Sequence, residues 1–99
     1  AMKSVYAIRI YELLMKEQMT RFIPADGVSV ILAIKTIREA CDCETKYEKI
    51  SQFKSKVIDI AVKEICRCTS YTVSYECLKK GRSIEAFRFH LNSKYNKIY

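Results

Sequence analysis

The sequence predicts an α+β domain in which three helices are followed by a C-terminal β-hairpin. Its 99 residues are 49% hydrophobic and 29% charged, which is the balance of one globular domain with a modest core. Apolar residues recur at helical spacing before Thr69, and after it they alternate as in a strand. We therefore expect a single domain over residues 1–99, with the helices first and the hairpin last.

The first helix is predicted over residues 4–17. Arg9, Glu12 and Lys16 fall on one stripe at helical spacing. Apolar side chains occupy most of the other positions: Val5, Ile8, Ile10, Tyr11, Leu14 and Met15. We expect this helix to be mostly buried.

A turn follows at "FIPADGVS", because Pro24 and the Asp-Gly pair are strong turn signals. The next stretch, "VSVILAIKTIREAC", fits two alternatives. It is either one helix, or a short strand at residues 28–32 that leads into a helix at residues 33–41. Adjacent β-branched residues favour the strand.

The segment "YEKISQFKSKVIDIAVKEICRC" predicts the longest helix, within residues 47–68. The positions that follow the helical period are Phe53, Val57, Ile60, Ala61, Glu64 and Ile65. We expect Phe53, Val57 and Ala61 to pack inward. The side chains expected to face solvent are Gln52, Ser55, Lys56, Asp59 and Lys63.

The N-terminal half of this helix carries side chains able to bind a nucleic acid. They are Ser51, Gln52, Ser55 and Lys56. Their hydroxyl, amide and ammonium groups can hydrogen-bond base edges or phosphates, and a helix N-terminus adds a favourable field for phosphate. A solvated helix face without a ligand explains the same residues, so the pattern alone leaves both interpretations open.

The hairpin is predicted from alternation. The residues of one parity are Tyr71, Val73, Tyr75 and Cys77, and those of the other are Thr72, Ser74 and Glu76. The turn "KKGR" and a second β-rich run, "SIEAFRFHL", follow. A bulge near Ala86 or Phe87 would let Ile84 and Phe87 share a face. Residues 93–99 are polar, and we expect them to fray.

Helix, helix, long helix and hairpin, with or without a strand at residues 28–32, form the order of a winged helix. In that fold the third helix enters the major groove and the hairpin, the wing, lies along the DNA backbone or the minor groove. Residues 1–50 carry 8 Lys and Arg against 7 Asp and Glu, whereas residues 51–99 carry 10 against 4. The excess positive charge, +7 for the chain, therefore belongs to the half with the long helix and the wing, and it favours a polyanionic partner.

Several other classes of protein are disfavoured. The longest apolar run, residues 30–34, is far shorter than the roughly 20 residues that span a bilayer, and no signal peptide is evident. We expect no membrane association and a cytoplasmic location. The sequence has no Gly-rich phosphate loop, no HExxH motif and a single histidine, His90, so we expect neither an enzyme nor a small-molecule substrate.

The five cysteines favour free thiols over a metal site. They are Cys41, Cys43, Cys66, Cys68 and Cys77, an odd number without a secretory signal. Two C-x-C pairs fit poorly to zinc motifs, whose paired cysteines stand two to four residues apart. We therefore expect no metal and no cofactor.

Three ordered stretches resemble one family. "SVYAIRIYELL", "KYEKISQFKSKVIDIAVKEI" and "VSYECLKKGRSIEAFRFH" resemble the C-terminal winged helix of iteron-binding plasmid replication initiators, the Rep-3 family. That family has a "YAIRLYELL"-like first helix, a "KY..F..FK.RV" groove helix ending in "KEI", and a "KKGR…F" hairpin. The resemblance covers about nine tenths of the chain, and three motifs in order are far more specific than one.

The resemblance implies sequence-specific binding to double-stranded DNA at repeated origin sites, the iterons, to initiate plasmid replication in the bacterial cytoplasm. It further implies that this chain is the second of two winged helices, and that a homodimer and host replication proteins are further partners. By position, the residues matching the family's reading helix and wing are Gln52, Lys54, Ser55, Lys56, Lys79, Lys80 and Arg82. With Ser51 they form the expected DNA-binding set. Ile60 stands where the family often has proline, which suggests a straighter helix.

Two alternatives to an initiator remain open from the sequence. A winged helix can serve as a protein-interaction or dimerisation module whose basic face meets an acidic partner, or it can belong to a transcriptional repressor. In the first case DNA of any sequence should fail to displace the partner. The second overlaps with the initiator hypothesis, because such initiators often bind their own promoters.

Overall fold

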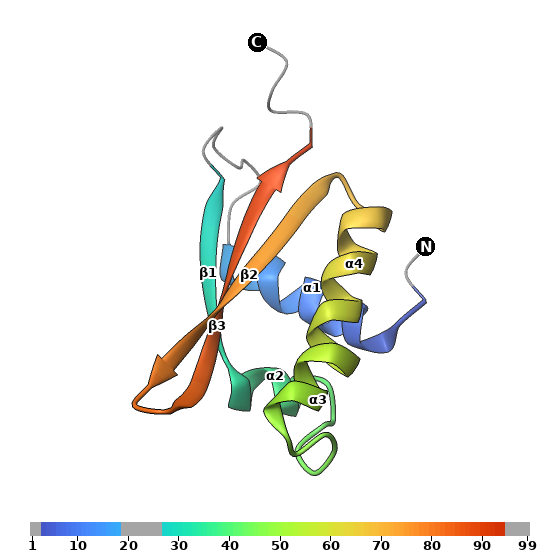
Figure 1. The fold of residues 1–99 in the computed structure, drawn as a ribbon. Helices are drawn as coiled ribbons and strands as arrows, with labels where there is room; N and C mark the ends of the chain where they lie inside the picture. The colour runs from blue at the N-terminus through green and yellow to red at the C-terminus, as the bar shows by residue number, and fades with distance from the viewer. Residues whose placement is uncertain (1–2, 19–26, 95–99) are drawn as a thin grey trace.

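Three helical segments pack on one face of a three-stranded sheet (Figure 1). The computed structural model describes residues 3–18 and 27–94. In chain order the elements are α1 (Val5–Gln18), β1 (Val28–Ala33), α2 (Ile34–Ala40), α3 (Ile50–Phe53), a π-helical turn (Lys54–Ile58), α4 (Asp59–Cys68), β2 (Tyr71–Lys80) and β3 (Ser83–Ser93). The predicted α+β class and the order of its elements are confirmed.

The sheet is antiparallel with strand order β1-β3-β2. Alternate residues of β1, Val30 and Leu32, are buried and lie opposite Phe89 and Phe87 of β3. This alternation confirms a strand followed by a short helix in the second segment, and the single-helix alternative is wrong. The strand forms because its inward side chains complete the core over β3.

The hairpin of β2 and β3 extends beyond the C-terminal end of β1. β1 pairs with residues 86–91 only, whereas β2 and β3 stay paired out to Lys80 and Ser83. Leu78 pairs with Ala86 and Lys79 with Ile84, so Glu85 is an extra, bulged residue. The predicted bulge is thus confirmed one residue earlier than expected, and it lets Ile84 pack against the core.

The long helix is continuous but not uniformly α-helical. Asp59 N–H bonds to the carbonyl of Lys54, the five-residue spacing of a π turn. Phe53, Val57 and Ala61 are fully buried, as predicted. Position 60 is isoleucine and not proline, and the helix nevertheless contains this wider turn just before it. The predicted straightness of the helix stays a prediction.

Two isoleucines of the long helix have the opposite burial to the one that a strict helical period predicts. Ile60 lies on the apolar period of the sequence but is 41% exposed, whereas Ile58 is fully buried beside Val57. The extra residue of the π turn lets two consecutive side chains enter the core and turns Ile60 outward.

Helix α1 buries one face only. Ala7, Ile10 and Leu14 are fully buried, but Val5 is 60% and Ile8 40% exposed. The prediction of a mostly buried helix is therefore wrong, since α1 lies at the surface of the helical layer and one of its faces meets solvent.

The start of α1 is tied to α4 by Glu64. Its carboxylate accepts hydrogen bonds from the backbone N–H groups of Lys3 and Ser4, the shorter one to each at 2.9 Å. These bonds lower the pKa of Glu64, because they favour its charged form.

The end of the described chain is anchored rather than frayed at residues 93 and 94. Ser93 is the last residue of β3. The Lys94 ammonium donates to the carbonyls of Cys66 and Thr69, and its backbone N–H donates to Ser70. The predicted tail is thus wrong at these two positions, and its remainder, residues 95–99, lies outside the described residues, as do residues 22–26 of the predicted turn.

All five cysteines are free thiols. Burial raises the pKa of Cys41 to about 11, and Cys43 is fully buried and donates its thiol hydrogen to the Cys41 carbonyl. Across residues 3–18 and 27–94, no group of three or more His, Cys, Asp and Glu is placed to hold a metal ion. Over the same ranges no helix has the length and apolar character needed to cross a bilayer.

Candidate nucleic-acid interface

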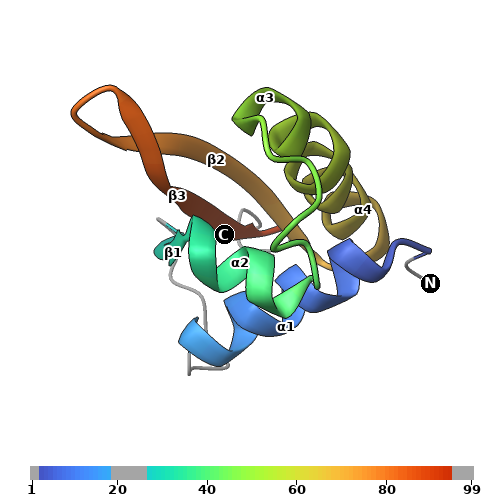
Figure 2. The ribbon, with the colours of Figure 1, turned by 90° about the horizontal axis from the view of Figure 1, so that it is seen from below.

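The predicted DNA-binding residues lie in two groups on separate elements. The first group, on α3 and the π turn, consists of Ser51, Gln52, Lys54, Ser55 and Lys56. The second, at the end of the hairpin, consists of Lys79, Lys80 and Arg82. The hairpin turn and α3 lie at the same end of the molecule (Figure 1), and in Figure 2 both lie on the side opposite α1. The fold therefore places both groups where one extended ligand can reach them.

The helix group presents polar side chains next to free backbone donors. Ser51, Gln52 and Lys56 are exposed, whereas Lys54 is half-buried. Lys49, the residue before α3, makes no side-chain hydrogen bond that caps the helix within the described chain. The first N–H groups of the helix therefore stay available to an anion, and they add to the charge of Lys56.

Ser55 is only partly free for a ligand. Its hydroxyl is exposed but donates to the carbonyl of Gln52 in its own helix at 3.3 Å. Such a long bond within the helix is easily exchanged for one to a ligand acceptor. Gln52 and Lys56 are therefore the stronger candidates for base contacts, and Lys54 is the weakest.

The wing group carries charge that no carboxylate of the described residues pairs with. Lys79, Lys80 and Arg82 are exposed on the two-stranded ribbon beyond β1. In the described part of the chain the ion pairs are Arg67–Glu64 and Arg88–Glu76, and neither involves a wing residue. The one carboxylate in the ribbon is that of the bulged Glu85, so the wing remains net positive.

A cluster of aromatic rings fixes the helix group relative to the wing. The Phe53 ring of α3 stacks on Phe87 of β3 with centroids 6.5 Å apart, and Tyr75 of β2 meets Phe87 edge-on at 5.5 Å. The Tyr75 hydroxyl donates to the Asp59 carboxylate of α4 at 2.5 Å. Burial, and then this bond, raise the pKa of Tyr75. Helix and wing are thus held through one rigid core.

Sequence reasoning missed further basic residues near the same end. Lys35 on α2 is exposed, as are Lys46 and Lys49 in the loop from α2 to α3, which also lies at this end in Figure 1. Glu44 and Glu48 alternate with the two loop lysines along the chain, so the net charge of this stretch does not indicate a basic surface. The two loop lysines become candidates only because the fold places the loop beside α3.

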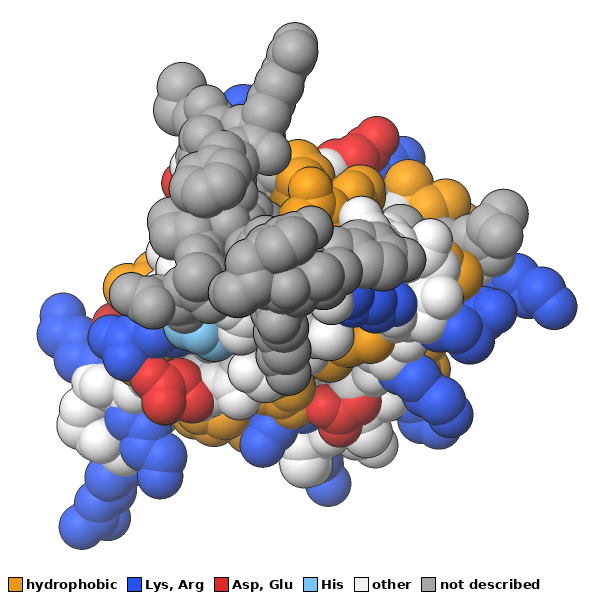
Figure 3. Space-filling model, turned by 90° about the horizontal axis from the view of Figure 1, so that it is seen from above, with side chains coloured by type: hydrophobic (Ala, Val, Ile, Leu, Met, Phe, Trp, Pro, Cys, Tyr) orange, Lys and Arg blue, Asp and Glu red, His pale blue; other side chains and the backbone are white. Residues whose placement is uncertain are grey.

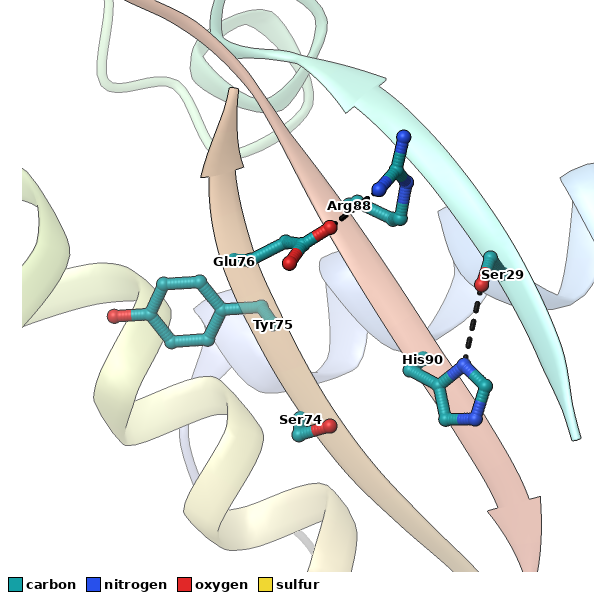
Figure 4. Close-up of a pocket in the computed structure, with 6 residues that line it drawn as sticks. All are labelled: Ser29, Ser74, Tyr75, Glu76, Arg88 and His90. Atoms are coloured by element: carbon teal, nitrogen blue, oxygen red, sulfur yellow. Dashed lines mark hydrogen bonds and ion pairs between the residues drawn. The ribbon is translucent and has the colours of Figure 1, made fainter. Parts of the chain in front are cut away.

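The face of the sheet that the helices do not cover holds a polar pocket of about 340 Å³ (Figure 4). Arg88 pairs with Glu76 across β2 and β3, and the His90 Nδ1 lies 3.1 Å from the Ser29 hydroxyl. No described carboxylate hydrogen-bonds to the His90 ring, so the Ser–His pair lacks the orienting group of a hydrolase site. The charged groups of the pocket are thus paired with each other, whereas those of the wing form no ion pair in the described chain.

A view from the end opposite the α3 end shows how the surface charge is distributed (Figure 3). Basic side chains project at the left, where the hairpin extends, and again at the right of the view. Acidic and hydrophobic side chains lie between them. Basic side chains thus extend outward at both sides of this view, and the hairpin side is one of them.

The helices, the antiparallel sheet and the projecting ribbon together define a winged-helix domain, as predicted. Residues 33–91 match the family described as "Initiator Rep protein, WH2", and the chain belongs to this family.

A solved structure described as "Crystal structure of Pi initiator protein in complex with iteron DNA" has the same fold, with a TM-score of 0.80 and 22% sequence identity. The match covers 93% of this chain and 40% of that one, so the present chain spans less than half the length of that protein. A search of curated protein sequences gave no match.

Proposed function

We propose that this domain binds double-stranded DNA at iterons, the repeated sites of a plasmid origin, and so takes part in initiating plasmid replication. The observation that carries the proposal is the joint position, at one end of the molecule, of a polar helix N-terminus and a basic wing. Among residues 3–18 and 27–94 the first has no side-chain cap and the second no ion pair. Membership of the initiator family supports the choice of ligand, as does the likeness to an initiator protein that is in complex with iteron DNA.

The two groups would have different tasks. Gln52, Ser55 and Lys56 would read base edges in the major groove, because amide, hydroxyl and ammonium groups match the donors and acceptors there. Lys79, Lys80 and Arg82 would bind phosphates, which positions the domain but carries no sequence information. Lys54 would contribute to the phosphate contacts through its charge, since its stem is half-buried.

The proposal extends to the setting in which the domain works. It would act without catalysis, in the bacterial cytoplasm on plasmid DNA. A longer protein containing it would add homodimerisation and contacts with host replication proteins. Repression of its own promoter would use the same DNA-binding face.

Selection from a pool of random duplexes tests the proposal, because it lets the domain choose its own target sequence. We expect a single enriched sequence, bound at least about a thousandfold more tightly than a scrambled duplex of the same composition. The native origin should contain this sequence as direct repeats. Equal binding to both duplexes, or no binding at moderate salt, would favour a protein-interaction module and contradict the proposal.

A further inference from the structure

Arg38 of α2 holds three carbonyl groups of the loop that leads into α3. Its Nη1 donates to the carbonyls of Cys43, at 2.9 Å, and Lys46, at 2.7 Å, and its Nη2 donates to that of Tyr47 at 3.0 Å. The rigid fork of donors on a guanidinium can bind several acceptors at once. One side chain therefore fixes the backbone at both ends of residues 43–47.

The same guanidinium also packs on the long helix. Its Cζ lies 4.3 Å from the centroid of the Phe53 ring, which is fully buried at the end of α3. A cation over an aromatic face is attracted to the ring quadrupole. Arg38 thus joins α2, the loop and the first turn of the long helix at one point.

The loop needs an external support because it contains unfavourable backbone conformations. Asp42 has φ 54° and Tyr47 has φ 52°, both in the left-handed region that residues with a Cβ rarely adopt. Lys49 and Ser51 follow Tyr47 closely along the chain. A change in the path of the loop would therefore change where the helix begins and how its first turn is oriented.

We propose that Arg38 is a positioning residue for DNA recognition. By holding three carbonyls of this loop and packing on Phe53, it sets the orientation in which Gln52 meets the bases. Three of its five N–H donors are engaged within the protein, so we assign it an effect through these residues and not a contact of its own with DNA. This inference rests on the proposed function.

Two substitutions separate the roles of charge and fork. Arg38→Lys keeps the charge but loses the fork, and Arg38→Met keeps only the stem. We expect each to lower the ratio of affinities for the selected and scrambled duplexes at least about tenfold. Affinity for the scrambled duplex should change less than about twofold, because the wing supplies it through phosphates. If Arg38→Met fails to fold, Arg38→Lys carries the test.

Hydrogen exchange and two control variants distinguish positioning from a general loss of stability. Amide exchange at residues 43–47 should be faster in Arg38→Lys than in the wild type. Thr36→Ala, at an exposed site on the same helix, should leave discrimination unchanged. Leu14→Ala, which opens a cavity in the core beneath α1, should lower stability while leaving discrimination intact at temperatures where it is folded.

The inference is overturned if Arg38→Lys discriminates like the wild type, or if Leu14→Ala loses as much discrimination as Arg38→Lys does. A failure of the proposed function looks different. In that case the wild-type domain itself binds the selected and scrambled duplexes equally.

Discussion

Tyr75 of β2 connects the strand that leads into the wing with α4, which continues the helix that we propose reads DNA bases. Its ring packs on Phe87, and its hydroxyl donates to Asp59. Burial and this bond raise the pKa of the phenol, so the folded protein prefers the neutral side chain. A raised pKa contributes stability that is present below the ordinary value of 10.0 and is lost as pH rises above it.

Tyr75→Phe tests this link at the scale of one residue. At pH 8 the variant should lose about 0.5–1 kcal/mol of unfolding free energy, the worth of one hydrogen bond. Above pH 10 the gap between wild type and variant should narrow, because only the wild type has this phenol to ionise. Urea unfolding at both pH values measures the gap. A gap that is constant or widens with pH would contradict the assignment.

The sequence indicates which residues could contact DNA at the proposed interface. It does not indicate which residues hold these contact residues in position. Gln52, Lys56 and the wing residues are predictable because their polar groups stand on exposed positions of a helix and a turn. The role of Arg38 is not predictable, since its partners lie in a loop whose left-handed residues, Asp42 and Tyr47, are not glycines. No turn signal in the sequence specifies that path.

At the scale of elements, periodicity predicts the helices and the hairpin well but misses the π turn. The buried set Phe53, Val57 and Ala61 fits an α-helix, and the burial of Ile58 in place of Ile60 does not. Both isoleucines are equally apolar, so tertiary packing decides which one enters the core. The hairpin bulge is predictable because Ile84 and Phe87 need to share a face, which a regular strand does not allow.

The two glycines of the described chain are required for different reasons. Gly27, before β1, has φ +82°, and a Cβ there would lie 2.6 Å from the Leu91 carbonyl oxygen. Gly81, at the wing turn, has φ +64° with open space around it. The first position therefore combines backbone strain with a steric clash, and the second has strain alone.

Alanine substitutions should separate these two effects. Gly81→Ala should cost about 1–2 kcal/mol, the usual penalty of a left-handed backbone, and Gly81→Asn should cost less. Gly27→Ala should cost clearly more than Gly81→Ala, because a backbone oxygen cannot move aside as a flexible side chain can. Urea unfolding of the three variants measures the difference. Equal losses for the two alanine variants would contradict the close approach of Leu91 to Gly27.

At the scale of the whole molecule, the uneven distribution of charge along the sequence corresponds to an uneven distribution in space. The half of the chain from residue 51 carries the long helix and the wing, and it holds most of the net charge of +7. The order of the elements and this asymmetry are sufficient to predict a winged helix. That α3 and the hairpin turn lie at one end can only be established from the fold.

The central claim is that the long helix reads bases while the wing binds phosphates, and a salt titration of three variants tests it most directly. The wing variant is Lys79→Ala, Lys80→Ala and Arg82→Ala. The helix variant is Gln52→Ala and Lys56→Ala. The matched control is Lys3→Ala, Arg9→Ala and Lys16→Ala, which removes three exposed charges at and before α1. Each protein is titrated against the selected and scrambled duplexes at several salt concentrations.

If about six phosphates are contacted, the wild type should lose affinity with log salt at a slope near −5. The wing variant should weaken on both duplexes alike, with a slope shallower by about 3, and the control should keep the wild-type slope. The helix variant should lose the difference between duplexes while binding the scrambled one nearly as well as before. A wing variant with an unchanged slope, or a helix variant that still discriminates like the wild type, would contradict the claim.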